Sequence, residues 1–407
     1  MKPELLMPAG NPQKMEYAFA FGADAVYLGV PVFSLRARDN EFHHDELKRG
    51  IELAHANNKK VYVTANIFSR NSKVNRFELE VEQIMECKPD ALIMSDPGLM
   101  ASVRERYADV PLHLSVQANC MNWQTVKFWH QSLGVSRIIL SRELTLDEIS
   151  EIKQRVPDVE LEAFVHGAIC IAYSGRCLLS SYMSNRDANQ GICDNTCREK
   201  FKTHTFVEDP RSPGEMYPIE EDDEGTYIMN AKDLCLIEHL DALRNAGVCS
   251  FKAEGRTKSV NYVSLVARAY RQGIDDLVAG RPYNPALYDE LLKTANRDFH
   301  EGFIRGNPGA DGQRYDTGQS KSATRLFAGL FTGEQKDGYL GVDVKGSFQV
   351  GSRIEIMGPN MFSTEFNIES ILDKNAQSVN KAHSGNGIYW IKGPKELVKH
   401  GILSVVL

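Results

Sequence analysis

Short apolar runs alternate with polar turns and amphipathic stretches along the first 166 residues, in a unit of about 25 residues. Continuous apolar runs are typical of parallel strands buried on both faces, and the amphipathic stretches predict helices. Seven strands are predicted here and an eighth much later: Glu4–Met7, Ala25–Leu28, Val61–Thr64, Ala91–Met94, Leu112–Val116, Arg137–Leu140, Leu161–Val165 and Ser250–Ala253. Eight strands joined by crossovers predict an α/β fold, a (β/α)8 TIM-like barrel. An open doubly wound sheet is the alternative.

Two segments break this rhythm. Residues 167–247 hold a cluster of cysteines and the acidic stretch EDPRSPGEMYPIEEDDEG, which predicts a solvated loop or hairpin. An insertion after the seventh strand would lie at the catalytic face of a barrel. From about Thr324, short apolar segments punctuated by glycine predict a small β-barrel. We therefore predict a TIM-like barrel over residues 1–315, with its cysteine-rich insertion, and a C-terminal β-domain over residues 316–407.

The composition narrows the class of protein. Of the 407 residues, 42% are apolar and 25% are charged, which is a globular balance. The net charge of −7 excludes a generally basic nucleic-acid coat but leaves room for a local basic patch. The sequence has no apolar run of the roughly 18–20 residues that a membrane span requires. Because Glu4 and Pro8 interrupt the N-terminal apolar stretch, we expect no signal peptide and a cytoplasmic protein.

Polar side chains directly after the predicted strands are the candidates for a catalytic site, since this end of a barrel carries the active site. They are Asn66, Asp96, Gln117, Arg142, Glu143, His166, Glu254 and Arg256. Together they could bind a polyanion and move protons. Each also has a structural interpretation: Asp96 or Glu143 could begin a helix, and the arginines could pair with Glu143 or Glu254. The sequence lacks HExxH, G-x-S-x-G, Walker and G-x-G-x-x-G motifs.

Five of the eight cysteines fall within one short stretch: Cys170, Cys177, Cys193, Cys197 and Cys235. In a reducing compartment such a cluster indicates a metal or redox centre more than disulfides. The spacing of Cys170 and Cys177 is too wide for a zinc knuckle, whereas iron–sulfur clusters accept irregular spacing. A structural zinc site and inert cysteines are the alternatives. Cys87, Cys120 and Cys249 are predicted to be small buried residues.

The stretch around Cys170 resembles the signature of the collagenase-like peptidase family, unassigned peptidase family thirty-two. The matching residues are Glu162, Phe164, Gly167, Ala168, Ile169, Cys170, Gly175, Cys177, Leu179 and Ser180. The resemblance extends to ELLMPAGN, NAKDLC, KAEGR and NRDFHEGF, and so covers most of the chain.

The resemblance implies an oxygen-independent hydroxylase that holds a [4Fe–4S] cluster. A barrel with one β-domain is most similar to the branch that converts the wobble uridine of tRNA to 5-hydroxyuridine, with prephenate as the implied oxygen source. Cys170, Cys177, Cys193 and Cys235 match the family's cysteines, and Cys197 is an alternate ligand, because a cubane takes at most four thiolates. Hydroxylation of a ribosomal RNA cytidine or of a quinone precursor is the alternative within the family.

The same resemblance suggests roles for other residues. Arg142, Arg256 and Arg36 or Arg38 would pair with the carboxylates of prephenate, and His166 would transfer a proton or bond to a cluster sulfur. The modified base would be extruded from the anticodon loop. Two basic stretches could contact RNA phosphates: Arg198, Lys200 and Lys202 with Phe201, and Lys252–Lys258. The competing classes are a metallo- or cysteine-dependent peptidase and an RNA-binding adaptor. The sequence is compatible with a homodimer and leaves the oligomeric state open.

Overall fold

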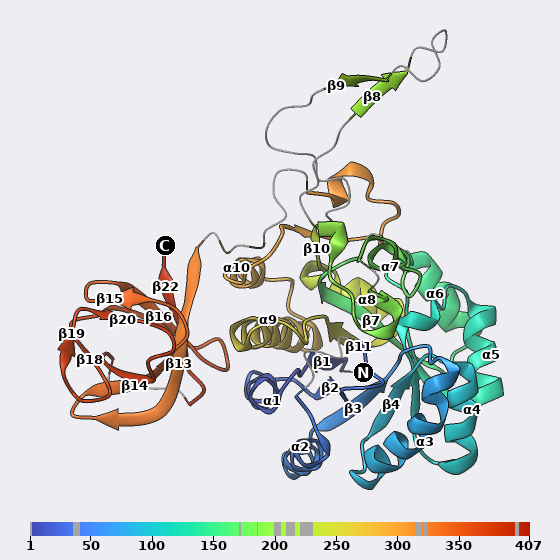
Figure 1. Cartoon of the computed structure of the whole chain (residues 1–407), viewed down its shortest axis with the longest axis horizontal. Coiled ribbons are helices and arrows are strands. Elements are labelled where there is room, and N and C mark those ends of the chain that lie inside the picture. Colours follow the sequence, from blue (N-terminus) through green and yellow to red (C-terminus); the bar gives the residue numbers. More distant parts are fainter. Residues whose placement is uncertain are drawn as a thin grey trace.

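The computed structural model has a parallel barrel followed by a smaller antiparallel β-domain (Figure 1). The structure describes residues 2–35, 41–170, 172–184, 186–198, 205–208, 216–219, 231–314, 320, 322, 324–394 and 399–407.

The barrel is built from eight parallel strands. They are β1 (Glu4–Pro8), β2 (Ala25–Gly29), β3 (Lys60–Ala65), β4 (Ala91–Met94), β5 (Leu112–Leu114), β6 (Val135–Ile139), β7 (Glu160–Gly167) and β11 (Val248–Ala253). The order is β11-β1-β2-β3-β4-β5-β6-β7, and pairing of β11 with β7 closes the ring. The predicted TIM-like barrel is confirmed. The fifth strand ends at Leu114, before its predicted end, because the Ser115 side chain accepts a hydrogen bond from Gln117 N and starts a 3-10 turn.

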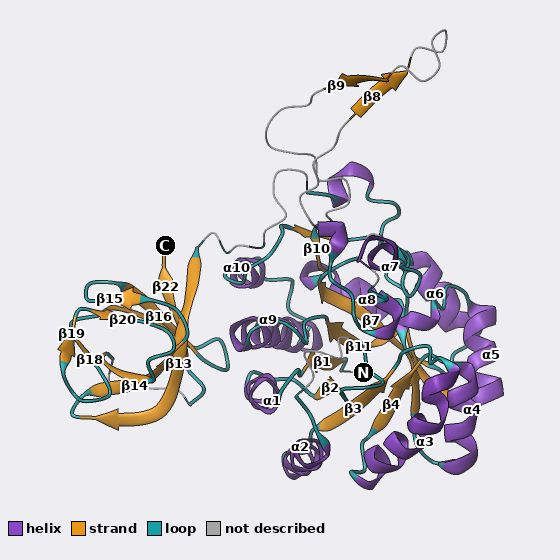
Figure 2. Ribbon diagram, viewed as in Figure 1, coloured by secondary structure: helices purple, strands orange, loops and turns teal. Residues whose placement is uncertain are grey.

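Helices surround the barrel (Figure 2). They are α1 (Pro12–Ala20), α2 (His44–Ala56), α3 (Asn71–Glu86), α4 (Pro97–Arg106), α5 (Trp123–Leu133), α6 (Leu146–Arg155), α8 (Leu240–Asn245) and α9 (Val260–Val278). Asp96 caps α4 by accepting hydrogen bonds from the N–H groups of Gly98 and Leu99, so its structural interpretation is confirmed. Thr145, not Glu143, caps α6 through a capping box with Glu148. Glu143 is thereby left for another role.

The insertion leaves the barrel at the carboxyl end of β7. It contains α7 (Leu179–Ser184) and the antiparallel pair β8 (Thr205–Glu208) and β9 (Met216–Ile219). This pair agrees with the predicted hairpin. β10 (Asp233–Cys235) returns antiparallel to β7, and β12 (Phe299–His300) pairs with β10.

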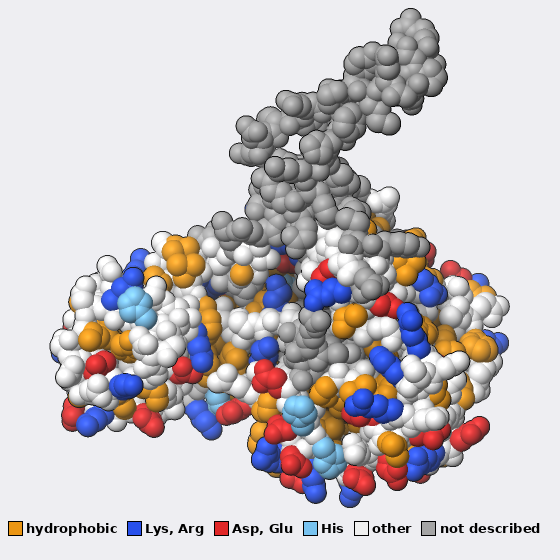
Figure 3. Space-filling view, viewed as in Figure 1, with side chains coloured by type: hydrophobic (Ala, Val, Ile, Leu, Met, Phe, Trp, Pro, Cys, Tyr) orange, Lys and Arg blue, Asp and Glu red, His pale blue; other side chains and the backbone are white. Residues whose placement is uncertain are grey.

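The C-terminal domain has its own apolar core. Its strands are β13 (Arg325–Lys336), β14 (Tyr339–Val344), β15 (Phe348–Gln349), β16 (Arg353–Met357), β17 (Ser363–Asn367), β18 (Ile371–Leu372), β19 (Ser378–Val379), β20 (Lys381–Ala382), β21 (Ile388–Lys392) and β22 (Ile402–Val406). Eight of them form one antiparallel sheet, and β15 pairs with β20. Acidic and basic side chains are interspersed over the visible face of the described residues (Figure 3).

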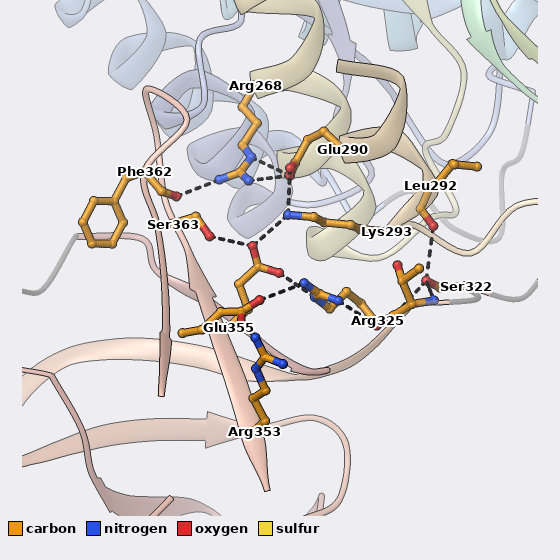
Figure 4. A network of polar contacts seen from close by, with 12 residues as sticks. Arg268, Glu290, Leu292, Lys293, Ser322, Arg325, Arg353, Glu355, Phe362 and Ser363 are labelled. Atoms are coloured by element: carbon orange, nitrogen blue, oxygen red, sulfur yellow. Dashed lines mark hydrogen bonds and ion pairs between the residues drawn. The ribbon is translucent and has the colours of Figure 1, made fainter. Parts of the chain in front are cut away.

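A buried ionic network joins the two domains (Figure 4). Arg268 of α9 donates to Glu290 of α10 (Ala286–Leu292) and to the carbonyl oxygens of Gly358 and Phe362, at 3.0 and 2.9 Å. Lys293 bridges the two sides, because its Nζ lies 2.9 Å from Glu290 and 2.7 Å from Glu355 of β16.

Glu355 is the central carboxylate of this interface. Its side chain is 3% exposed and also accepts hydrogen bonds from Arg325 and Ser363. Burial acts to raise the pKa of Glu355, but the hydrogen bonds from Lys293, Ser363 and Arg325 outweigh it and lower the pKa to about 2. The ionised carboxylate therefore stabilises the folded chain, and of these three hydrogen bonds the one from Lys293 crosses between the domains.

Candidate functional site

A cavity of about 160 Å³ that opens to solvent lies at the carboxyl ends of the barrel strands. Six of the eight candidate residues that follow the strands line it: Asn66, Gln117, Arg142, Glu143, Glu254 and Arg256. The insertion supplies another part of the wall, including Cys170, Cys177, Cys193 and Cys197. The structure thus brings strand-end polar groups and thiols together at the face where barrels carry their active sites.

Arg142 lines the cavity and is held by two contacts. Its guanidinium lies 3.7 Å from the ring centroid of Phe164, and Nη2 lies 3.3 Å from a Glu254 carboxylate oxygen. Its Nε is buried and has no hydrogen-bond partner among the described residues. A guanidinium held in this way on the cavity wall can donate hydrogen bonds to the carboxylate of a ligand.

Two further cations lie deeper in the cavity wall. Arg256 donates to Ser34 Oγ and Thr64 Oγ1, and Lys252 places Nζ 2.8 Å from Glu162 and 4.2 Å from the ring centroid of Tyr27. Lys252 is 3% exposed. Its predicted contribution to a surface patch for RNA phosphates is wrong, because the side chain is buried inside the barrel.

The signature residue Glu162 forms the base of this arrangement. It is fully buried and pairs with Lys252 at 2.8 Å and with Arg137 at 3.2 Å. Burial acts to raise the pKa of Glu162, but Lys252 and Arg137 outweigh it and lower the pKa. Alternation along β11 could have revealed Lys252, since Ser250, Lys252 and Glu254 are spaced two residues apart and share a face.

The other predicted residues are already engaged locally. Asn66 accepts from the Leu35 N–H at 3.2 Å and donates to Ser115 Oγ at 3.1 Å. Glu143 accepts from the Ser174 N–H at 3.0 Å. Among the predicted ligand-binding and RNA-binding residues, Arg36, Arg38, Lys200, Phe201, Lys202 and the Arg198 side chain lie outside the described residues.

His166 is separate from the cavity. It is 1% exposed, its Nδ1 lies 3.4 Å from Tyr270 Oη, and its ring packs against Tyr262 and Phe299. Burial lowers the pKa of His166 to about 3, so the imidazole is neutral at physiological pH. The structure does not bring this predicted proton carrier to the residues that line the cavity.

Four of the five clustered cysteines share the cavity wall. Cys170 is exposed, while Cys177, Cys193 and Cys197 are half-buried. Cys235 lies on β10, buried, with Sγ 3.9 Å from Tyr270 Oη, and burial raises its pKa to about 11. In the described ranges, no three His, Cys, Asp or Glu side chains are placed to hold a single metal ion. A set of four thiols suits a cubane, whose ligands are distributed over four irons instead of one.

The barrel, the strand-end cavity and the cysteine-rich insertion define a TIM-barrel protein with one candidate active site at its carboxyl face. Residues 10–314 match the model of peptidase family U32, and residues 323–403 match the model of that family's C-terminal domain. The chain therefore belongs to peptidase family U32, which confirms the resemblance. None of the described helices is long and apolar enough to cross a membrane.

Three relatives cover nearly the full length. The chain is 45% identical to tRNA hydroxylation protein P of Escherichia coli K12, over 97% of this chain and 95% of that protein. It is 44% identical to tRNA hydroxylation protein P of Haemophilus influenzae, over 97% of this chain and 94% of that protein. It is also 30% identical to a protein named collagenase from Porphyromonas gingivalis, over 95% of this chain and 93% of that protein.

Proposed function

We propose that this chain is a tRNA hydroxylase that forms 5-hydroxyuridine at the wobble position, with a [4Fe–4S] cluster and prephenate as the oxygen source. The observation that carries the proposal is one cavity that combines four thiols with three buried or half-buried cations. The relatives named tRNA hydroxylation protein P support the reaction class, since each aligns with nearly the whole chain.

Four thiolates of the insertion would hold the cluster, which supplies electron transfer when bound. Cys170, Cys177 and Cys193 would be ligands whether Cys197 or Cys235 is the fourth. Cys197 is favoured as the fourth ligand because it lines the same cavity, whereas Cys235 is buried beside Tyr270. The family resemblance predicts Cys235 as the fourth ligand and Cys197 as the alternate, and this proposal exchanges the two.

The cationic floor would bind and orient the co-substrate. Prephenate is a dicarboxylate, and planar guanidinium groups match carboxylates in bidentate contacts. Arg142 lines the cavity with its guanidinium stacked on Phe164, and Lys252 adds a buried positive charge whose partner is Glu162. Glu254 holds Arg142 in place at 3.3 Å. We assign Glu254 a positioning role, like that of Glu143 on Ser174.

A uridine in a duplex could not reach this cavity, but the bases of an anticodon loop can be splayed out. Two basic side chains of the barrel contact the insertion at residues adjacent in sequence to cavity-lining ones: Arg70 lies 3.5 Å from Asp187, and Lys73 donates to Gln190 at 3.2 Å. These contacts fix cations near the place where phosphates of the loop would pass.

The test begins with purification without oxygen. We expect about four irons and four sulfides per chain, lost in Cys170→Ala, and a hydroxylated uridine in tRNA after incubation with prephenate and reductant. Stoichiometric zinc without sulfide, reproduced after anaerobic reconstitution, would refute the redox mechanism. Cleavage of collagen peptides that survives loss of the cysteines would instead establish the peptidase alternative.

A further inference from the structure

A turn of the insertion presents an aromatic ring at the rim of the cavity. Tyr173 lines the cavity, yet 59% of its surface is exposed. An exposed tyrosine beside a ligand cavity offers an apolar ring face, which is the group that binds unpaired bases by stacking.

The turn that carries this ring is fixed on both sides. On one side, Ser174 donates through its N–H and Oγ to Glu143, at 3.0 to 3.3 Å. On the other, Gly175 has a φ of +75°, and a Cβ there would lie 2.2 Å from the carbonyl oxygen of Gln117. Only glycine allows this close approach. Because its backbone is already ordered, Tyr173 can bind a ligand at a reduced entropic cost.

The residue beneath the turn supplies a complementary polar group. The Gln117 side chain lines the cavity and is 8% exposed, and none of the described residues hydrogen-bonds to its amide. An amide donates and accepts at once, which matches the N3–H and O4 edge of uracil. A ring face above and an amide below are the recognition groups that a single extruded base requires.

We propose that Tyr173 and Gln117 form the nucleobase subsite of this cavity, with Tyr173 stacking on the extruded pyrimidine and Gln117 bonding to its edge. The assignment rests on the proposed function and deepens it by placing the base at the rim, above the cationic floor. The tRNA base and prephenate then occupy separate parts of one cavity. A substitution at the rim is therefore expected to weaken RNA binding and to leave prephenate binding unchanged.

The experiment compares two anticodon stem-loop RNAs, one with uridine and one with an abasic sugar at the wobble position. Their affinities for the full-length, anaerobically purified chain are measured by fluorescence anisotropy. Tyr173→Ala is expected to weaken binding of the uridine RNA about tenfold or more, because stacking contributes about 1–3 kcal/mol per base. The same substitution is expected to leave the affinity for the abasic RNA unchanged. Tyr173→Phe keeps the native affinity, since the ring remains.

The matched control is Phe128→Ala on α5, which removes a ring that is 56% exposed and lies outside the cavity. It leaves both affinities unchanged. Gln117→Leu, with its fold checked by circular dichroism, weakens only the uridine RNA. Equal binding of uridine RNA by Tyr173→Ala and the native chain would overturn the subsite, as would an equal loss for both RNAs. Failure of the native chain to bind either RNA would instead refute the proposed tRNA substrate.

Discussion

Replacing Glu355 by glutamine removes the charge at the centre of the domain interface while keeping the shape of the side chain. The folded-state pKa is about 2, against an ordinary value of 4.5. That difference corresponds to about 3 kcal/mol of stability at neutral pH. Because the pKa is lowered, this contribution is complete above about pH 4.5 and disappears as the pH falls towards 2.

The assay is urea unfolding of the native and Glu355→Gln chains between pH 7 and about pH 3. We expect the variant to be less stable by about 3 kcal/mol at pH 7, and more than half of this difference to be lost by about pH 3. Glu365→Gln is the control, because Glu365 is 30% exposed and its ion pairs with Arg325 and Arg353 should contribute little. An equal destabilisation at both pH values would refute the charge argument.

Three further predictions concern the cavity. Arg142→Lys should weaken prephenate binding about tenfold in calorimetry, since an ammonium cannot make a bidentate contact; unchanged affinity would exclude Arg142 as an anion ligand. Gly175→Ala should weaken uridine RNA binding, because its Cβ would clash with Gln117; native affinity would show that the turn is not fixed there. Cys197→Ala should lose cluster iron, whereas Cys235→Ala should retain it; the opposite result would restore Cys235 as the ligand.

The barrel could be predicted because buried parallel strands leave continuous apolar runs that stand out from the polar turns between them. The strand-end candidates followed from the barrel, since residues after parallel strands meet at one face. Asn66, Gln117, Arg142 and Glu254 do line one cavity. His166 does not, because the last residues of β7 pair with β10, and no local pattern in the sequence predicts that pairing.

Other features depend on contacts between distant segments. The Lys252–Glu162 pair joins residues 90 positions apart, and the Lys293–Glu355 pair joins residues 62 apart. In each pair, the sequence around one residue does not indicate which distant residue it contacts. The positions of the cysteines also depend on irregular backbone, for which hydrophobic periodicity makes no prediction.

The central claim is tested most directly by nucleoside mass spectrometry of tRNA incubated without oxygen with the loaded chain, reductant and prephenate. The account predicts a wobble uridine heavier by one oxygen atom, formed only when prephenate is present and absent with Cys170→Ala. Unmodified tRNA after incubation with a chain that holds about four irons and four sulfides would contradict it.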